Sequence, residues 1–251
     1  MASESPTAAN TIKAEASSAI PIGSSRNIIL RELPKSELDS IAEVAEWVSL
    51  KGKDPIWEPN RPIEHVYFPQ TAVISIVTLL DTGPIEAITI GNDGFVGLPV
   101  FHGPGETVNR AGCQMPGDSW RLSTQSLIDL CDSAHQLRRV LDRYSQLVIE
   151  TISQSAACNR VHVIEERCAR WLLMSHDRVG SDEIPLTQEF LAQMLGVRRP
   201  GVTVAIGILE RAGLISHGRG RITITDRKGL EAASCECYAV IKRREMILRG
   251  G

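Results

Sequence analysis

The protein has 251 residues, of which 43% are hydrophobic and 23% are charged, and its formal net charge is -3. That length allows one large domain or two modest ones, and the composition excludes collagen, coiled-coil rods and overall disorder. No apolar stretch approaches the ~20 residues that cross a bilayer, and the N-terminus lacks the pattern of a secretory signal. We therefore expect a cytoplasmic protein without a membrane partner, whose six cysteines are reduced thiols.

Charge is unevenly distributed along the chain. Residues 1–180 hold 16 Lys and Arg against 22 Asp and Glu, whereas residues 181–251 hold 11 against 8. Within residues 198–228, seven basic side chains accompany only Glu210 and Asp226. A local excess of positive charge in an acidic protein indicates either a polyanionic partner for that end or a solvated basic face.

The first half of the chain predicts a tail, a short helix and a β domain. Residues 1–24 are rich in Ala, Ser, Thr and Pro without periodicity, which predicts a disordered tail. A helix is predicted from Lys35 to Trp47, because start signals precede apolar residues at helical spacing. From Ile56 to Leu122, short apolar runs with turn residues about every ten positions are typical of a β-sandwich or barrel.

The stretch from Ala134 to Ala157 contains neither Gly nor Pro and predicts one long helix. Six of its residues recur in steps of three and four: Leu137, Leu141, Tyr144, Val148, Thr151 and Ser155. This stripe could pack on its own β domain, or it could pair with the same helix of a second subunit. Its narrow width and the length of the helix favour a homodimer. A second helix from Val161 to about His176 and a linker over residues 177–183 are predicted to follow.

The next segment has the pattern of a helix-turn-helix. Thr187 is predicted to cap a helix of about two turns. Gly196 then provides the turn, because a residue without a Cβ leaves a helix in the left-handed region at least cost. A second helix begins around Arg198, Arg199 and Pro200, since proline is tolerated in a first helical turn. The second helix of such a motif can enter the major groove of DNA.

A wing is predicted directly after these helices. The segment L-I-S-H-G-R-G-R-I-T-I-T-D indicates two strands joined by a glycine turn, with Arg219 and Arg221 at the tip. Two short helices around a glycine are a common packing motif and are weak evidence for DNA binding when they occur alone. Here they coincide with the basic segment and with a basic hairpin, and this combination predicts a winged helix-turn-helix that binds double-stranded DNA.

Three segments resemble the Crp/Fnr superfamily of bacterial transcription regulators, and the resemblance covers nearly everything after the tail. They are D-G-F-V-G-L-P-V-F, E-E-R-C-A-R-W-L-L and L-T-Q-E-F-L-A-Q-M-L-G-V-R-R-P-G-V. The resemblance implies an α+β fold: an N-terminal double-stranded β-helix, jelly-roll-like sensor domain, a long dimerisation helix and a C-terminal winged helix-turn-helix. The cyclic-nucleotide-binding-like sensor would span residues 25–160, with the dimerisation helix at about 134–157. The DNA-binding domain with its C-terminal helix would span residues 161–251.

The resemblance also places an effector pocket. Family members hold a ribose with a Gly-Glu pair and a phosphate with an Arg-Ser or Arg-Thr pair. The corresponding positions resemble Gly97-Leu98 and Thr107-Val108 here, with Arg110 close by. Losing the carboxylate and the guanidinium removes the strongest contacts of a cyclic nucleotide. We therefore expect an unknown small-molecule effector in place of cyclic AMP, and the sequence identifies no cofactor.

The function implied is that of a homodimeric transcription regulator on a palindromic operator, with RNA polymerase as a further candidate partner. Arg199 and Thr203 would read bases, and Val204 would contact thymine methyl groups. Arg198, Arg221 and the N-terminus of the Thr187 helix would hold phosphates. The predicted DNA-binding residues are Thr187, Gln188, Arg198, Arg199, Pro200, Thr203, Val204, His217, Arg219 and Arg221.

Other constellations carry less information. The sequence holds no P-loop, metalloprotease, nucleophile-elbow or dinucleotide-binding fingerprint, so we do not expect an enzyme. Cys235 and Cys237, with His217 as a distant third ligand, lack a second close pair, and no metal site is predicted. The remaining alternative is a β-roll ligand-binding module that acts through protein–protein contacts and shows no salt-dependent affinity for duplex DNA.

Overall fold

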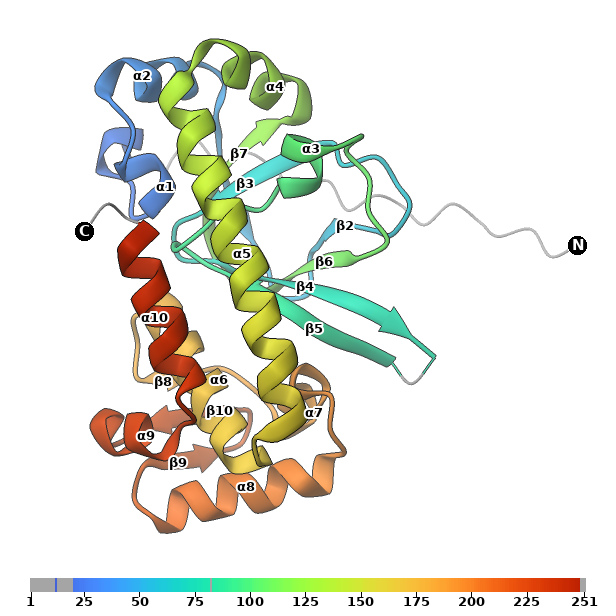
Figure 1. The fold of residues 1–251 in the computed structure, drawn as a ribbon, viewed down its shortest axis with the longest axis vertical. Coiled ribbons are helices and arrows are strands. Elements are labelled where there is room, and N and C mark those ends of the chain that lie inside the picture. Colours follow the sequence, from blue (N-terminus) through green and yellow to red (C-terminus); the bar gives the residue numbers. More distant parts are fainter. Residues whose placement is uncertain (1–11, 13–19, 82, 249–251) are drawn as a thin grey trace, which may run out of the picture.

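The computed structural model describes residues 12, 20–81 and 83–248 (Figure 1). The fold is mixed α+β, as predicted, with a β-rich N-terminal part and a helical C-terminal part joined by the long helix α5. Within the described ranges, no helix is both long enough and apolar enough to span a bilayer.

The N-terminal β-roll consists of two antiparallel sheets. One sheet has the order β1-β7-β3 and the other β2-β6-β4-β5. The strands are β1 (Glu46–Leu50), β2 (Pro55–Trp57), β3 (His65–Pro69), β4 (Val73–Leu80), β5 (Gly83–Ile90), β6 (Arg110–Met115) and β7 (Gly117–Ser123). The helical elements around them are η1 (Ile22–Ser24), α1 (Ile28–Arg31), α2 (Lys35–Val44), α3 (Leu98–His102), α4 (Thr124–Ser133) and α5 (His135–Val161).

Two sequence predictions at the N-terminal end need correction. Residues 1–11 and 13–19 of the predicted tail lie outside the described residues, but Ile22 is 8% exposed and belongs to the β-roll core. The helix predicted to reach Trp47 ends at Val44, because Ala45 already has extended backbone angles. Trp47 instead lies in β1, where its ring packs edge-on against Trp120 of β7 at 5.2 Å.

Helix α5 is longer than predicted, with 27 residues, and its first half packs against the β-roll of the same chain. Leu137, Leu141 and Tyr144 are buried in the β-roll core. The interpretation that assigned this stripe to a second subunit is therefore wrong for these three positions. Further along the same helix, Ile149 is 60% exposed and Ile152 is 39% exposed.

The C-terminal part builds a second core around a small three-stranded sheet with the order β8-β10-β9. Its elements are α6 (Ile164–Val179), β8 (Glu183–Ile184), α7 (Gln188–Leu195), α8 (Arg199–Arg211), β9 (Ile215–Gly218), β10 (Arg221–Ile224), α9 (Arg227–Ala233) and α10 (Cys237–Leu248). Val73 and Val77 of β4 also belong to this core. The β-roll and the C-terminal part are thus packed against each other through apolar side chains.

A buried ion pair joins the two parts. Arg178, near the end of α6, donates from Nε to Asp93 at 2.9 Å, and their side chains are 6% and 17% exposed. Burial alone would raise the pKa of Asp93, but the charge and the hydrogen bond of Arg178 lower it below its usual range. The stem of Arg178 lies so close to Gly91 that a Cβ there would come within 2.9 Å of it, so the loop before α3 is fitted to this side chain.

We predict that Asp93→Ala lowers the free energy of unfolding by ~3–5 kcal/mol, because it removes the carboxylate that pairs directly with the buried guanidinium of Arg178. The folded-state pKa of Asp93 lies below the ~3.9 of a free aspartate, so this stabilisation is complete above about pH 4 and is lost as pH falls further. Urea unfolding at pH 7 and at acidic pH measures both effects. Asp39→Ala, which breaks the exposed pair with Lys35, is the control and should change stability by less than ~0.5 kcal/mol. An equal loss in both variants would contradict the prediction.

Candidate nucleic-acid interface

Helix α7 begins at the cap that the sequence predicted. The hydroxyl of Thr187 accepts a hydrogen bond from the amide of Phe190 at 3.1 Å. Leu191, Met194 and Leu195 bury the apolar face of the helix. The helix ends at Gly196, whose φ of +62° is the left-handed conformation that favours glycine. The turn therefore has the geometry that the sequence predicted.

Helix α8 presents the side chains predicted to read DNA on its solvent side. It starts at Arg199, with Arg198 as its N-cap residue and Pro200 in its first turn. Val202, Ala205, Ile206 and Leu209 anchor its opposite face in the core. On the free face, Arg199, Thr203 and Val204 are exposed, the last by 58%.

Polar contacts link the exposed face of α8 to α7. Thr203 donates its hydroxyl to Oε1 of Gln188 at 2.8 Å, and Arg199 lies 3.7 Å from the carboxylate of Glu189. The Arg199 and Glu189 side chains are 66% and 75% exposed, so water weakens their attraction and leaves the guanidinium able to change partner at little cost.

The wing is formed by β9 and β10, as predicted. Gly220, with φ of +75°, makes the turn, and Arg219 and Arg221 are exposed at its tip. In β9, one residue before Gly218, His217 lies 2.9 Å from Glu210 through its Nδ1, and its amide donates to the same carboxylate at 3.0 Å. These bonds hold the pKa of Glu210 below its usual range. His217 therefore fixes the wing to the end of α8.

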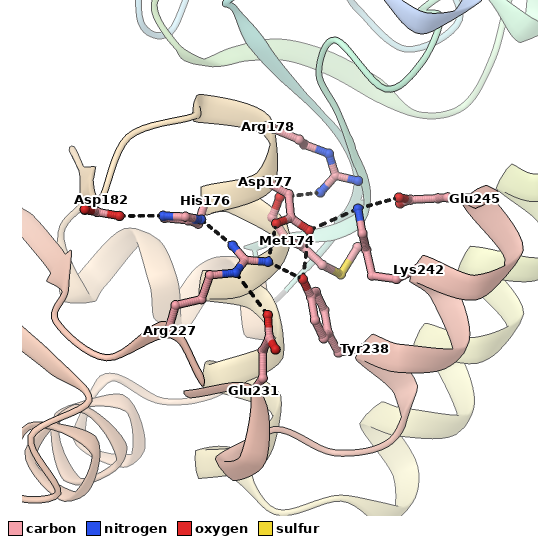
Figure 2. Close-up of polar contacts among 10 residues, drawn as sticks. All are labelled: Met174, His176, Asp177, Arg178, Asp182, Arg227, Glu231, Tyr238, Lys242 and Glu245. Atoms are coloured by element: carbon pink, nitrogen blue, oxygen red, sulfur yellow. Dashed lines mark hydrogen bonds and ion pairs between the residues drawn. The ribbon is translucent and has the colours of Figure 1, made fainter. Parts of the chain in front are cut away.

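A polar network fastens α9 and α10 to α6 behind this surface (Figure 2). The carboxylate of Asp177 accepts hydrogen bonds from Arg227 at 2.7 Å and from the Tyr238 hydroxyl at 3.0 Å, and it lies 3.1 Å from Lys242. Burial opposes ionisation of Asp177, but Lys242 and Arg227 together hold its pKa below the usual range. The C-terminal helices therefore belong to the same packed unit as the helix-turn-helix.

The β4–β5 hairpin of the β-roll reaches the turn of the helix-turn-helix. Pro84 and Ile85 line a groove of about 630 Å³ together with Gly196, Arg198 and Arg199. In the middle of β5, Trp171 of α6 donates its indole N–H to Glu86 at 2.9 Å. A displacement of this hairpin would therefore change the contacts of the residues at the start of α8.

The residues expected to bind an effector lie at the start of α3 and in the segment that leads into β6, and they are only partly suited to that role. Gly97 is buried and is the N-cap residue of α3, where a Cβ would clash with Phe95 and Val66. Val108 is 71% exposed. Arg110 lies 2.8 Å from Glu58, and Thr107 bonds to Asn109 beside it. The only guanidinium among the predicted pocket residues thus already has a carboxylate partner.

Comparison with known proteins identifies the helix-turn-helix. Residues 166–233 match the family described as Crp-like helix-turn-helix domain. A search of curated proteins found no significant match. Solved structures with the same fold include a transcriptional regulator of the Crp/Fnr family from Eubacterium rectale, with 17% identity, 82% of this chain and 96% of that chain covered, and a TM-score of 0.64.

Two further structures extend this finding. FixK2 from Bradyrhizobium japonicum has 20% identity and a TM-score of 0.66, with 76% of this chain and 98% of that chain covered. TTHA1359, a transcriptional regulator of the CRP/FNR family from Thermus thermophilus, has 22% identity and a TM-score of 0.59, with 75% and 98% covered. Residues 166–233 thus have the pattern of a Crp-like helix-turn-helix domain, and the chain shares its overall fold with solved Crp/Fnr regulators.

Three important residues of this region were not singled out from the sequence. Asp93 stands at the start of the D-G-F-V-G segment, but its partner Arg178 and the network residue Asp177 fell in the predicted linker. Helix α6 continues through both of them to Val179. The helical spacing of Trp171, Ser175 and Arg178, all buried, was the available signal.

We predict that Thr187→Ala destabilises the C-terminal unit by ~1 kcal/mol, because α7 loses the side-chain acceptor for a free amide at its first turn. Thr187→Ser is the matched control, since it keeps the hydroxyl and should retain most of the stability. Thermal unfolding followed by circular dichroism measures the difference. Equal midpoints for the Ala and Ser variants would contradict the assigned cap.

Proposed function

We propose that the protein is a sequence-specific transcription regulator that binds a palindromic operator as a homodimer and responds to an effector other than cyclic AMP. The observation that carries this proposal is the exposed basic face of α8 and the wing, on a domain of the Crp-like helix-turn-helix family. Of the side chains suggested for DNA contact, Arg198, Arg199, Arg219 and Arg221 are all exposed, which supports this proposal.

Distinct roles follow from the positions of these residues. Arg199 and Thr203 lie in the first turns of α8, which enter the major groove in this class of domain, so they are placed to contact base edges. Arg198, at the N-cap, and the wing residues Arg219 and Arg221 are placed to contact phosphates. Val204 offers an apolar surface to a thymine methyl group.

Helix α5 offers a surface for the second subunit. Ile149 and Ile152 are exposed apolar residues one turn apart, on the half of the helix that the β-roll does not cover. Val161 at the end of α5 and Val163 just after it are also exposed, by 70% and 57%. A two-fold axis along this helix would present two copies of α8 to two operator half-sites.

The proposed effector response depends on the contacts between the β-roll and the C-terminal unit. An effector that binds two arrangements of the β-roll unequally would shift the position of the β4–β5 hairpin or of the loop that carries Asp93. Both contact the C-terminal unit, the first at the turn before α8 and the second at Arg178.

The experiment that tests DNA binding is selection of random duplexes by the purified protein, followed by anisotropy titration of the best site at several salt concentrations. We expect a two-fold symmetric site and a steep fall of affinity with salt. Arg199→Ala should weaken binding ~5- to 150-fold and relax the base preference, whereas Arg219→Ala should weaken all duplexes alike and reduce the salt slope by about one. Lys51→Ala, an exposed change on the β-roll, is the control. Failure to select any site would favour the alternative of a module that acts through protein contacts.

We predict that Ile149→Glu converts the protein to a monomer, because it places a charge among the apolar side chains of the proposed interface. Analytical ultracentrifugation measures the oligomeric state. Ile128→Glu, on an exposed apolar position of α4 that is 41% exposed, should leave the dimer intact. A wild-type protein that sediments as a monomer at high concentration would contradict the proposed assembly.

Saturating cyclic AMP is expected to leave the affinity for the selected duplex unchanged. Leu98 has no carboxylate for a ribose hydroxyl, and Arg110 is already paired with Glu58. Titration with and without the nucleotide measures the effect. A cyclic AMP-dependent gain of tenfold or more would show that the pocket binds it.

A further inference from the structure

Four metal-binding side chains converge where helix α5 meets the start of α10. Cys158 lies in the last turn of α5 and His162 directly follows it, whereas Cys235 lies between α9 and α10 and Cys237 is the first residue of α10. Their ligand atoms all lie within 4.8 Å of one another. The sulfurs of Cys158 and Cys235 are 3.5 Å apart, and the Cys237 sulfur is 3.6 Å from Nδ1 of His162.

These distances fit the ligands of a single tetrahedral ion. Four ligands around zinc, with Zn–S bonds of ~2.3 Å, are separated by ~3.8 Å along each edge of the tetrahedron. The two measured separations are already close to this value, and the largest permitted one, 4.8 Å, requires only small side-chain movements. The set therefore leaves room for one ion at its centre.

Neighbouring groups are arranged as they would be around a metal. His162 turns Nδ1 toward the thiols, while its Nε2 lies 3.2 Å from the carboxylate of Glu236. A carboxylate behind a ligating histidine fixes the ring and makes it a stronger ligand. On the other side, the amide of Gln154 donates to the sulfur of Cys237 at 3.1 Å, which stabilises negative charge on that atom.

Ordinary core packing does not account for the three cysteines. A buried free cysteine usually behaves as a small apolar residue among aliphatic side chains. Cys158, Cys235 and Cys237 are 0%, 5% and 1% exposed, yet they form a buried cluster of their own, apart from the two hydrophobic cores. Cys113, Cys131 and Cys168, in contrast, lie within those cores.

We propose that Cys158, His162, Cys235 and Cys237 form a zinc site that ties the end of α5 to the start of α10. Three thiolates and an imidazole are the donors of a closed structural zinc site, in which protein ligands fill all four positions. His217, the third ligand considered from the sequence, lies instead in strand β9 of the wing beside Glu210. The sequence argument missed the site because Cys158 and His162 are more than 70 residues before Cys235.

The position of the site gives it a structural consequence. Helix α10 is fastened to α6 and α9 through the carboxylate of Asp177, and it contacts α5 again through Arg244 and Glu150, whose side chains lie 2.5 Å apart. A zinc ion at the α5 end would fix the long helix to the DNA-binding unit at a second point. Because metal binding to the folded state stabilises it, the unfolding temperature should rise with zinc concentration.

The test uses the full chain, purified anaerobically with a non-thiol reductant and stripped of metal by a chelator. We expect it to take up one Zn²⁺ per chain by elemental analysis, and one Co²⁺ with the thiolate charge-transfer and visible bands of a tetrahedral site. The double variant Cys235→Ser with Cys237→Ser should lose both, and Cys131→Ala should keep both. Stoichiometry in the wild-type protein needs no variant, so a variant that fails to fold does not obscure the result.

A finer variant tests the arrangement behind the histidine. Glu236→Gln should weaken zinc binding ~10- to 100-fold in competition with a chelator while the stoichiometry stays at one. The proposal is overturned if the wild-type chain binds no Zn²⁺ or Co²⁺, or if the double cysteine variant binds them as tightly as the wild type. It is also overturned if mass spectrometry of the anaerobic protein finds a disulfide between Cys158 and Cys235. None of these readouts involves DNA, so they are independent of the proposed function.

Discussion

The ion pair between Asp93 and Arg178 is the constraint on which the arrangement of the two parts depends. Each charge is costly to remove from water, so each needs the other in place. Around the pair, the loop at Gly91 is fitted to the arginine stem, and Trp171 donates a hydrogen bond to Glu86 in the preceding strand, β5. The β-roll and the C-terminal unit are therefore held by directional polar contacts as well as by apolar packing, and directional contacts are the kind that a small rearrangement can break.

The packing of the C-terminal unit buries the apolar faces of its helices and leaves its basic side chains exposed. The apolar faces of α7 and α8 are buried in the second core, whereas the basic side chains of α8 and the wing face solvent. Charge repulsion among these side chains is tolerated because they are solvated and because Glu189 and Glu183 lie nearby. A duplex would replace those weak partners with phosphates and base edges, which is the physical basis of the proposed function.

Local signals in the sequence were sufficient to predict the helix-turn-helix. Thr187, Gly196 and Pro200 each have one strongly preferred place in a helix or turn, so the boundaries of α7 and α8 follow from them. The long helix was also predicted from local signals, but the surface against which its apolar stripe packs was not. A residue such as Tyr144 has the same periodicity whether it packs on its own domain or on a second subunit, so the distinction needs the tertiary structure.

The contacts between segments far apart in the chain could not be predicted from the sequence. Arg178 was placed in a linker, since nothing nearby indicates that its partner is Asp93, 85 residues earlier. The cysteine and histidine cluster was missed in the same way, because only the folded chain brings the end of α5 to Cys235. Effector-binding residues were suggested by resemblance alone, and the pairing of Arg110 with Glu58 shows how such a carry-over depends on neighbours that it does not include.

The most direct test of the account is a methylation-protection footprint of the full-length protein on its selected duplex, which reports access to guanine N7 in the major groove. If two copies of α8 enter the groove, protection should appear in two patches about 10 base pairs apart, and Arg199→Ala should remove it at guanines within both patches. Protection confined to one patch, or none at a concentration that saturates the duplex, would contradict the account.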